Sequence, residues 1–268
     1  MSNAALKVLA GAGAKGDPVY VDDLFSTFVY DGNRSTQTIT NGIDLSGEGA
    51  LVWLKGRDAS GGSNHRLYDT ERGANKSLVS NSNAAETTHT DQLTSFNSDG
   101  FSIGASADIN WDAQPFGTKW VSWTFRKQPG FCDIVTWTGN GVSGREIPHS
   151  LGSVPGMILV KNLNFASDWR VFHRSLGPTK NMLLNGTNAA LTQTGMWNDT
   201  APTSTVFTVG NDGGVNGNAS TYNYVAYVFA HDAQDFGENS NEAIIKCGSY
   251  TGNGSSTGPS INLGFEPQ

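Results

Sequence analysis

The chain has 268 residues and a net charge of −7, from 17 Lys and Arg against 24 Asp and Glu. This balance argues against a surface that binds nucleic acid or an anionic membrane, because such surfaces need basic clusters. Only 15% of the residues are charged, 10% are aromatic, and the 33 glycines exceed the usual share. This composition favours short strands joined by tight polar turns over helices.

The first 24 residues differ from the rest of the chain. Residues 1–24 stand outside the internal repeat described below, and we expect them to form an N-terminal attachment arm. They lack a basic region, and Lys7 interrupts their short apolar run, which argues against a secretory signal and for synthesis in the cytoplasm. No stretch of the chain approaches the roughly 18 apolar residues of a transmembrane helix, so we expect no membrane insertion.

An internal repeat organises the remainder. Six motifs recur in the same order at offsets of roughly 106 residues. Two clear examples are LVWLKGRD from Leu51, which returns as MILVKNLN from Met157, and WVSWTF from Trp120, which returns as YVAYVF from Tyr224. We therefore expect a first module at residues 25–131 and a second at residues 132–242.

A turn motif occurs three times. YDGN from Tyr30 returns as WTGN from Trp137 and as YTGN from Tyr250. The third occurrence is followed by NLGFEPQ from Asn262, which parallels SLGSVPG, the turn before the long apolar strand of the second module. We expect residues 243–268 to be the start of a truncated third module within a longer polypeptide. The alternative is that a neighbouring subunit completes this unit.

Each module is predicted to consist of strands. Residues 50–55 and 157–161 are near-continuous apolar runs, typical of a central strand that is buried on both faces. Residues 120–125 alternate, so that Trp120 lies on one face and Phe125 on the other. The fold class that follows is all-β, with tandem antiparallel β-sandwich, jelly-roll-like modules and a short N-terminal arm. Two cysteines, Cys132 and Cys247, are expected to be buried thiols rather than a disulfide framework.

Several longer motifs together resemble a repeat family of tail-fibre and other virion structural proteins of marine phages and cyanophages. These motifs are TGNG, SLGSVPGMILVK, SDWRVFHRS, WNDTAPTSTVFTVG, YVAYVFAHD, FNSDGFSIG and WTFRKQPGF, and the resemblance covers roughly residues 20–268. It implies a structural role in a virion, in a tail appendage. In members of that family a further apolar strand follows the CGSYTGNG motif, which agrees with a truncated third module.

Motifs of catalysis are lacking in the sequence. It contains no G-x-S-x-G, H-E-x-x-H, Walker or C-x-x-C motif, and we expect no enzyme and no cofactor. None of the histidines has a spacing that indicates metal ligation; they are His65, His89, His149, His173 and His231. The carboxylate pairs Asp22 with Asp23 and Asp232 with Asp235 leave polysaccharide cleavage open as an alternative, because opposed carboxylates catalyse glycoside hydrolysis.

A weak candidate for a calcium loop is the D-x-N-x-D run of Asp108, Asn110 and Asp112, whose side chains offer oxygen ligands. The run lacks the glycine and the distal glutamate of an EF-hand. A polar loop whose Asp and Asn side chains stabilise turns is the favoured interpretation, and we expect no metal.

Two tryptophans in polar, turn-like segments, Trp111 and Trp197, are candidates for sugar binding, because flat rings stack on the apolar faces of sugars. Packing in the core is the favoured alternative for both. Arg66 and Arg170 occupy equivalent positions in the two modules, and we interpret them as a repeated structural ion pair.

The expected function is a non-enzymatic structural subunit of a phage virion, a tail fibre or tail appendage that supports attachment to the host surface. The N-terminal arm would bind other tail proteins, and side-by-side copies, most simply three, would bind a host-surface glycan by avidity. The expected location is therefore the phage tail or particle surface. Two alternatives remain: a decoration protein or head fibre of the capsid, and a tailspike that binds or degrades carbohydrate.

Overall fold

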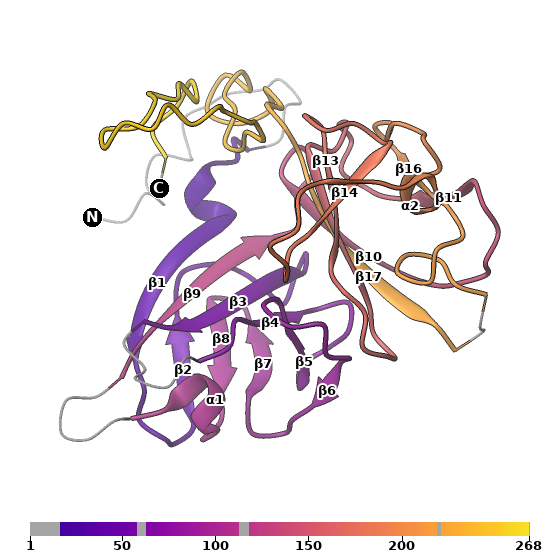
Figure 1. The fold of residues 1–268 in the computed structure, drawn as a ribbon. Coiled ribbons are helices and arrows are strands. Elements are labelled where there is room, and N and C mark those ends of the chain that lie inside the picture. Colours follow the sequence, from indigo (N-terminus) through magenta and orange to yellow (C-terminus); the bar gives the residue numbers. More distant parts are fainter. Residues whose placement is uncertain (1–16, 58–62, 113–117, 219–220, 268) are drawn as a thin grey trace.

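The computed structural model describes residues 17–57, 63–112, 118–218 and 221–267. Over these residues the chain is all-β, with seventeen strands arranged in antiparallel sheets (Figure 1). The helices are short: a 3-10 helix at Val21–Asp23, α1 at Ala107–Asn110 and α2 at Thr194–Trp197. The predicted fold class is thus confirmed. No helix in the described ranges has the length and apolar character needed to cross a membrane.

A six-stranded sheet forms the centre of the N-terminal half. Its strand order is β1-β9-β3-β4-β5-β6, and every neighbouring pair is antiparallel. The bounds are β1 Phe25–Asp31, β9 Lys119–Arg126, β3 Ala50–Gly56, β4 Arg66–Asp69, β5 Lys76–Val79 and β6 Thr87–Thr88.

The C-terminal half contains a second six-stranded sheet with the same connectivity. Its order is β10-β17-β12-β13-β14-β15, so that each strand has a counterpart at the same place in the first sheet. The bounds are β10 Cys132–Thr138, β17 Asn223–Phe229, β12 Met157–Asn162, β13 Arg170–His173, β14 Lys180–Leu183 and β15 Leu191–Thr192. In each half, the strand that comes first along the chain pairs with the one that comes last: β1 with β9, and β10 with β17.

A smaller sheet covers one face of each large sheet. In the first half it has three strands, β2 Gln37–Thr40, β8 Gly100–Ile103 and β7 Leu93–Asn97. In the second half it has two, β11 Arg145–Pro148 and β16 Val206–Val209, and the single turn of helix α2 stands where the first half has β7. Met196 and Trp197 of this helix enter the core of their half, as Leu93 of β7 does in the other.

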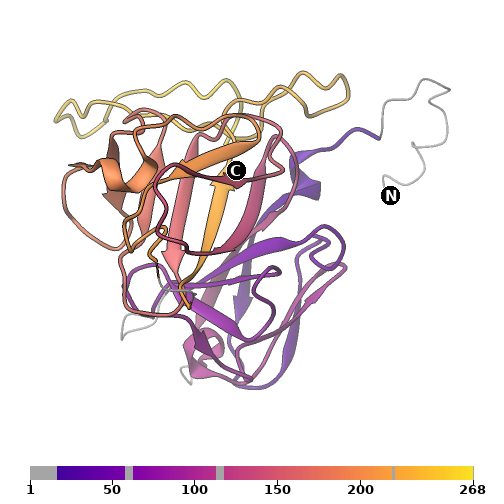
Figure 2. The same ribbon diagram turned by 90° about the vertical axis from the view of Figure 1, so that its right-hand side faces the viewer.

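Three apolar cores show that the sheets are stacked in four layers. One core lies between the first large sheet and its small sheet, and another lies between the second large sheet and its small sheet. The third core joins the two large sheets face to face. Its buried members include Leu51, Leu67 and Leu78 from the first sheet and Leu159, Val171 and Tyr227 from the second. Figure 2 shows the two halves stacked on each other.

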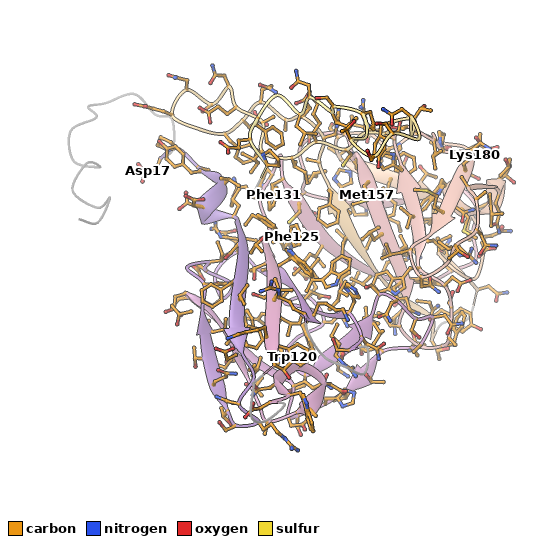
Figure 3. All side chains as sticks on the ribbon, turned by 60° about the vertical axis from the view of Figure 1, so that its left-hand side comes forward. Asp17, Trp120, Phe125, Phe131, Met157 and Lys180 are labelled. Carbon is orange, nitrogen blue, oxygen red and sulfur yellow. The ribbon has the colours of Figure 1, made fainter. Side chains whose placement is uncertain are left out.

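This layering explains the two sequence patterns on which the strand predictions depended. β3 and β12 are apolar along their length because each lies between a small sheet and the opposite large sheet. The alternation of β9 is confirmed, since Trp120 enters the core of its own half and Phe125 packs on the central core. Figure 3 shows Trp120 well inside the first half, whereas Phe125 and Phe131 lie toward its junction with the second half.

The two ends of the chain differ from these layers. Residues 1–16 of the predicted attachment arm lie outside the described residues, whereas Val19 and Leu24 pack on the central core. Residues 243–267, where we expected a third module to begin, contain no strand.

Both cysteines are buried and free, as predicted, and burial raises the pKa of the Cys132 thiol well above its ordinary value.

Polar groups also cross the junction between the two large sheets. The guanidinium of Arg72 is 3% exposed and lies 2.5 Å from the carboxylate of Asp69 and 3.0 Å from that of Glu86. It also donates to the hydroxyl of Tyr227, which in turn donates to Asp69 at 2.7 Å. Burial alone would lower the pKa of Arg72, but Asp69, Tyr227 and Glu86 raise it above its ordinary value. The first half thus supplies a paired charge to which the second half adds a hydroxyl.

We expect Arg72→Met to lower the free energy of unfolding by about 3–5 kcal/mol, because it leaves the carboxylate of Asp69 buried without its cation. Urea unfolding at neutral pH measures this loss. Lys246→Met is the matched control, since it removes a more exposed ion pair with Asp232 and should change the free energy by about 1 kcal/mol or less. Equal losses in the two variants would contradict a buried polar link between the halves.

Candidate functional site

The repeated turn motif is held by one buried asparagine in each half. In the first half, Asn110 accepts the backbone N–H of Asn33 at 2.8 Å and donates to two carbonyl oxygens, those of Ser35 and Gly104. Both side chains that hold the turn, Asn110 here and Asn216 in the second half, are fully buried. We call Asn110 and Asn216 the clamp asparagines.

The second half repeats this geometry. Asn216 accepts the N–H of Asn140 at 3.0 Å and donates to the carbonyl oxygens of Val142 and Gly210. The aromatic residue three positions before the turn asparagine makes an equivalent hydrogen bond in both halves, to the carbonyl oxygen of the residue before the clamp asparagine. The hydroxyl of Tyr30 donates to Ile109 at 2.8 Å, and the indole N–H of Trp137 donates to Val215 at 3.1 Å.

Glycine is required in this turn by a close approach of the backbone. A side chain at Gly32 would clash with the carbonyl oxygen of Trp111, the residue after the first clamp asparagine. A side chain at Gly139 would clash with the carbonyl oxygen of Gly217, which follows the second clamp asparagine. The motif aromatic-x-Gly-Asn therefore encodes a docking geometry, in which strand β1 or β10 is fixed to the loop that carries the clamp.

The predicted calcium ligands take part in other contacts. The amide of Asn110 is occupied by the clamp bonds, and Asp108 forms an ion pair of 2.6 Å with Arg66 and accepts from Gln92 at 2.9 Å. Asp112 is half-buried in the loop that follows. These contacts agree with the structural interpretation of the D-x-N-x-D run. Sequence reasoning identified Asn110 as a polar loop residue but missed its role as a clamp.

The predicted repeat of the Arg66 ion pair is wrong. Asp108, the partner of Arg66, immediately precedes Ile109 and the first clamp asparagine. The equivalent position in the second half is Gly214, so Arg170 meets a glycine where Arg66 meets a carboxylate. No ion pair of Arg170 is formed within the described residues.

The two candidate tryptophans have different surroundings. Trp197 is 1% exposed and meets Phe172 edge-to-face in the core of the second half, with ring centroids 5.8 Å apart. Trp111 is 37% exposed, and the guanidinium of Arg34 lies over its ring at 4.6 Å. Of the two, only the Trp111 ring is therefore accessible at the surface, and its cation partner already occupies one position over that ring.

Four of the five histidines, His65, His149, His173 and His231, accept a hydrogen bond at Nδ1 within the protein. Nδ1 of His65 accepts from the indole of Trp53, and Nδ1 of His231 accepts from the backbone N–H of Cys247. Burial lowers the pKa of both imidazoles, which favours the neutral, accepting form. No cluster of three or more His, Cys, Asp or Glu that could hold a metal ion occurs in the part of the chain that the structure describes.

The carboxylate pairs considered for glycoside hydrolysis lie near the ends of the folded layers. Asp22 and Asp23 belong to the exposed 3-10 helix, where Asp23 accepts the backbone N–H of Tyr20. Asp232 lies 3.4 Å from the amine of Lys246. At least two of these four carboxylates thus stabilise local structure.

Two adjoining surface grooves run beside β10, the edge strand of the second sheet. Their volumes are about 410 and 470 Å³, and both are lined by Glu71, Thr136 and Trp137. Glu71 forms an ion pair of 2.7 Å with Lys127. Glu86, which lines the first groove, belongs to the buried Arg72 network. Two of the three acidic side chains that line these grooves, Glu71 and Glu86, therefore already stabilise cations of the protein itself, whereas the third, Glu146, lines the second groove.

A buried lysine also bridges the two halves. Lys161 on β12 is fully buried and donates to the carbonyl oxygens of Asn162 at 2.9 Å and of Asn83, in the first half, at 3.3 Å. Burial lowers its pKa to about 8, although the charge of Asp168 acts in the opposite direction. Its counterpart Lys55 binds Ser63 within its own half. The sequence pattern predicted a buried strand but gave no sign of this contact.

Comparison with known proteins gives one family. The family model described as Domain of unknown function (DUF7483) matches residues 21–268. Neither a curated protein nor a solved structure matches the chain.

We expect Asn216→Ala to lower the free energy of unfolding by about 3 kcal/mol, because it leaves one N–H and two carbonyl oxygens without partners. Asn218→Ala is the control: its exposed side chain lies two residues away and should cost about 0.5 kcal/mol or less. Urea unfolding distinguishes the two variants.

Urea unfolding of the wild-type chain with excess Ca²⁺ and with EGTA should give the same midpoint. A midpoint raised by Ca²⁺ would instead indicate a cation site.

Lys161 predicts a specific dependence of stability on pH. Its folded pKa of about 8 lies below its ordinary value of 10.5, so the unfolded chain binds the extra proton between these values. Stability from this group is lost as pH falls through about 8, and is recovered fully above 10.5. The free-energy difference between wild type and Lys161→Met should therefore change by on the order of 2–3 kcal/mol from pH 7.5 to 10.5. A difference that is constant with pH would show that Lys161 is charged equally easily in both states.

Proposed function

We propose that this chain, which belongs to the DUF7483 family, is a non-enzymatic structural protein of a phage virion, in a tail fibre or tail appendage. The virion assignment is supported by the resemblance of its linked repeat motifs to phage structural proteins. The family description carries no activity, and the proposal therefore depends on the motifs together with the architecture.

One observation carries the structural part of the proposal: the two halves are joined into four layers by a common core. Leu159 and Tyr227 of the second sheet are buried against the first sheet. Burial of this kind resists relative motion of the halves, because close-packed interiors have low compressibility and transmit strain. A stiff body of this form suits a protein that transmits or withstands force in a particle.

The polar side chains that sequence analysis considered for chemistry support the same proposal. Asp108 is paired with Arg66, and Asn110 holds a turn. Each of these groups is used to stabilise the fold. Host attachment, as part of the proposed role, would use exposed loops such as the one that carries Trp111, because loops tolerate change while the strands stay fixed.

The proposed assembly has two parts. The N-terminal arm, residues 1–24, would bind other tail proteins, and copies of the chain, most simply three, would lie side by side. Weak contacts of each copy with a host-surface glycan would then add up by avidity. The alternatives differ in position on the particle or in activity: a capsid decoration protein or head fibre, and a tailspike that binds or cleaves carbohydrate.

Immunogold electron microscopy of purified particles that encode this chain tests the proposal. Gold on the tail or its fibres is the expected result, and gold on the shell would favour the decoration protein instead. Absence of gold from all particles would contradict a virion protein. Release of reducing sugars from host polysaccharide, abolished by a single substitution of Asp or Glu, would contradict the non-enzymatic part.

A further inference from the structure

The third copy of the turn motif keeps the sequence of the first two but lacks their surroundings. Tyr250 is 69% exposed, whereas its counterparts Tyr30 and Trp137 are 6% and 8% exposed. Figures 1 and 2 show the yellow C-terminal segment running over one end of the molecule without any strand. Among the described residues after Gly248, the only backbone hydrogen bond outside regular elements is the local one from Gly258 to Ser255.

The turn itself is nevertheless formed. Asn253 accepts the backbone N–H of Ser255 at 2.9 Å. The same bond is made by Asn33 with Ser35 at 2.8 Å, and by Asn140 with Val142 at 3.0 Å. The local half of the motif therefore exists in the third copy, and what differs is the loop on which the first two copies dock.

The glycine of the third turn provides independent support. Gly32 and Gly139 are required because a side chain would clash with the carbonyl oxygen that follows a clamp asparagine. Around Gly252 there is no atom of the described structure that a side chain would meet within 4 Å. The third copy thus keeps the glycine of the motif, although no contact within the described residues requires a glycine there.

The first two copies show what would cover this segment. In each, the first strand pairs antiparallel with the last long strand of the same half, β1 with β9 and β10 with β17. Tyr30 donates its hydroxyl to Ile109, the residue before the clamp, at 2.8 Å. A tyrosine at position 250 can make the same bond through its hydroxyl.

We propose that residues 245–257 are the first strand and turn of a further repeat unit, and that they dock on that unit's last long strand and clamp asparagine. In both known halves the first strand precedes its partner strand on the same chain. We therefore assign the covering unit to the same polypeptide, C-terminal to the segment, rather than to a second copy. The inference is independent of the proposed location on a virion.

The test adds such a unit to the 268-residue chain. Residues 157–242, from β12 through β17, are appended as a second copy after residue 268, and amide hydrogen exchange of peptides within 248–257 is followed by mass spectrometry, because the N–H of Cys247 is already bonded to His231. In the 268-residue chain these amides should exchange rapidly. In the extended chain we expect exchange roughly 100-fold slower, because the strand is paired and the turn is clamped.

Two substitutions in the extended chain identify the docking contact. Gly252→Ala should restore rapid exchange, because the added methyl group would meet the carbonyl after the clamp. Gly248→Ala is the matched control and should leave the protection intact, since its counterpart in β10 is Val135, which carries a side chain. Loss of protection in both variants, or in neither, would overturn the assigned docking geometry.

A control for folding replaces residues 245–268 of the extended chain with a second copy of residues 132–156. This unit keeps its own first strand, which should be protected. Protection there together with rapid exchange at 248–257 in the test chain would overturn the proposal. Protection of 248–257 in the 268-residue chain that rises with protein concentration would assign the covering partner to a second copy, and would overturn the choice of the same polypeptide.

Discussion

The face-to-face contact of the two large sheets holds the two halves together in one folded body. Each large sheet has two apolar faces, and its small sheet covers only one of them. The other face is buried only because the opposite large sheet lies against it. Separating the halves would expose residues such as Leu51, Leu159 and Phe229 to water, at a cost of about 25 cal/mol for each Å² of apolar area.

Polar contacts at this junction make the arrangement specific. Arg72 and Asp69 come from the first half and Tyr227 from the second, and together they satisfy one another in a site without access to solvent. Lys161 reaches across in the opposite direction to the carbonyl of Asn83. An apolar face alone would tolerate sliding, whereas buried polar groups must meet their partners at one position.

Much of the fold could be predicted from the sequence because the repeat and the periodicity are local signals. Apolar runs at 50–55 and 157–161 identified the central strands, and the alternation at 120–125 assigned side chains to two faces. The packing of one half on the other could not be predicted, because Leu51 and Leu159 have the same pattern whether their outer face meets a sheet, a partner or another copy. A strand pattern reports that a face is buried but does not identify what covers it.

The candidate site shows the same limit at the level of single residues. Asn110 and Trp197 were selected as polar or turn-like from their neighbours, yet both are fully or almost fully buried. A signal was present, since Asn110 and Asn216 follow the turn asparagines Asn33 and Asn140 at separations of 77 and 76 residues. The meaning of that spacing became visible only when the two segments were seen in contact.

Scanning calorimetry of the 268-residue chain tests most directly whether the two halves share one core. If they do, they unfold together, and we expect a single transition whose calorimetric enthalpy equals its van 't Hoff enthalpy. Two resolved transitions, each with the enthalpy of about half the chain, would contradict it and would show that the halves are separate bodies.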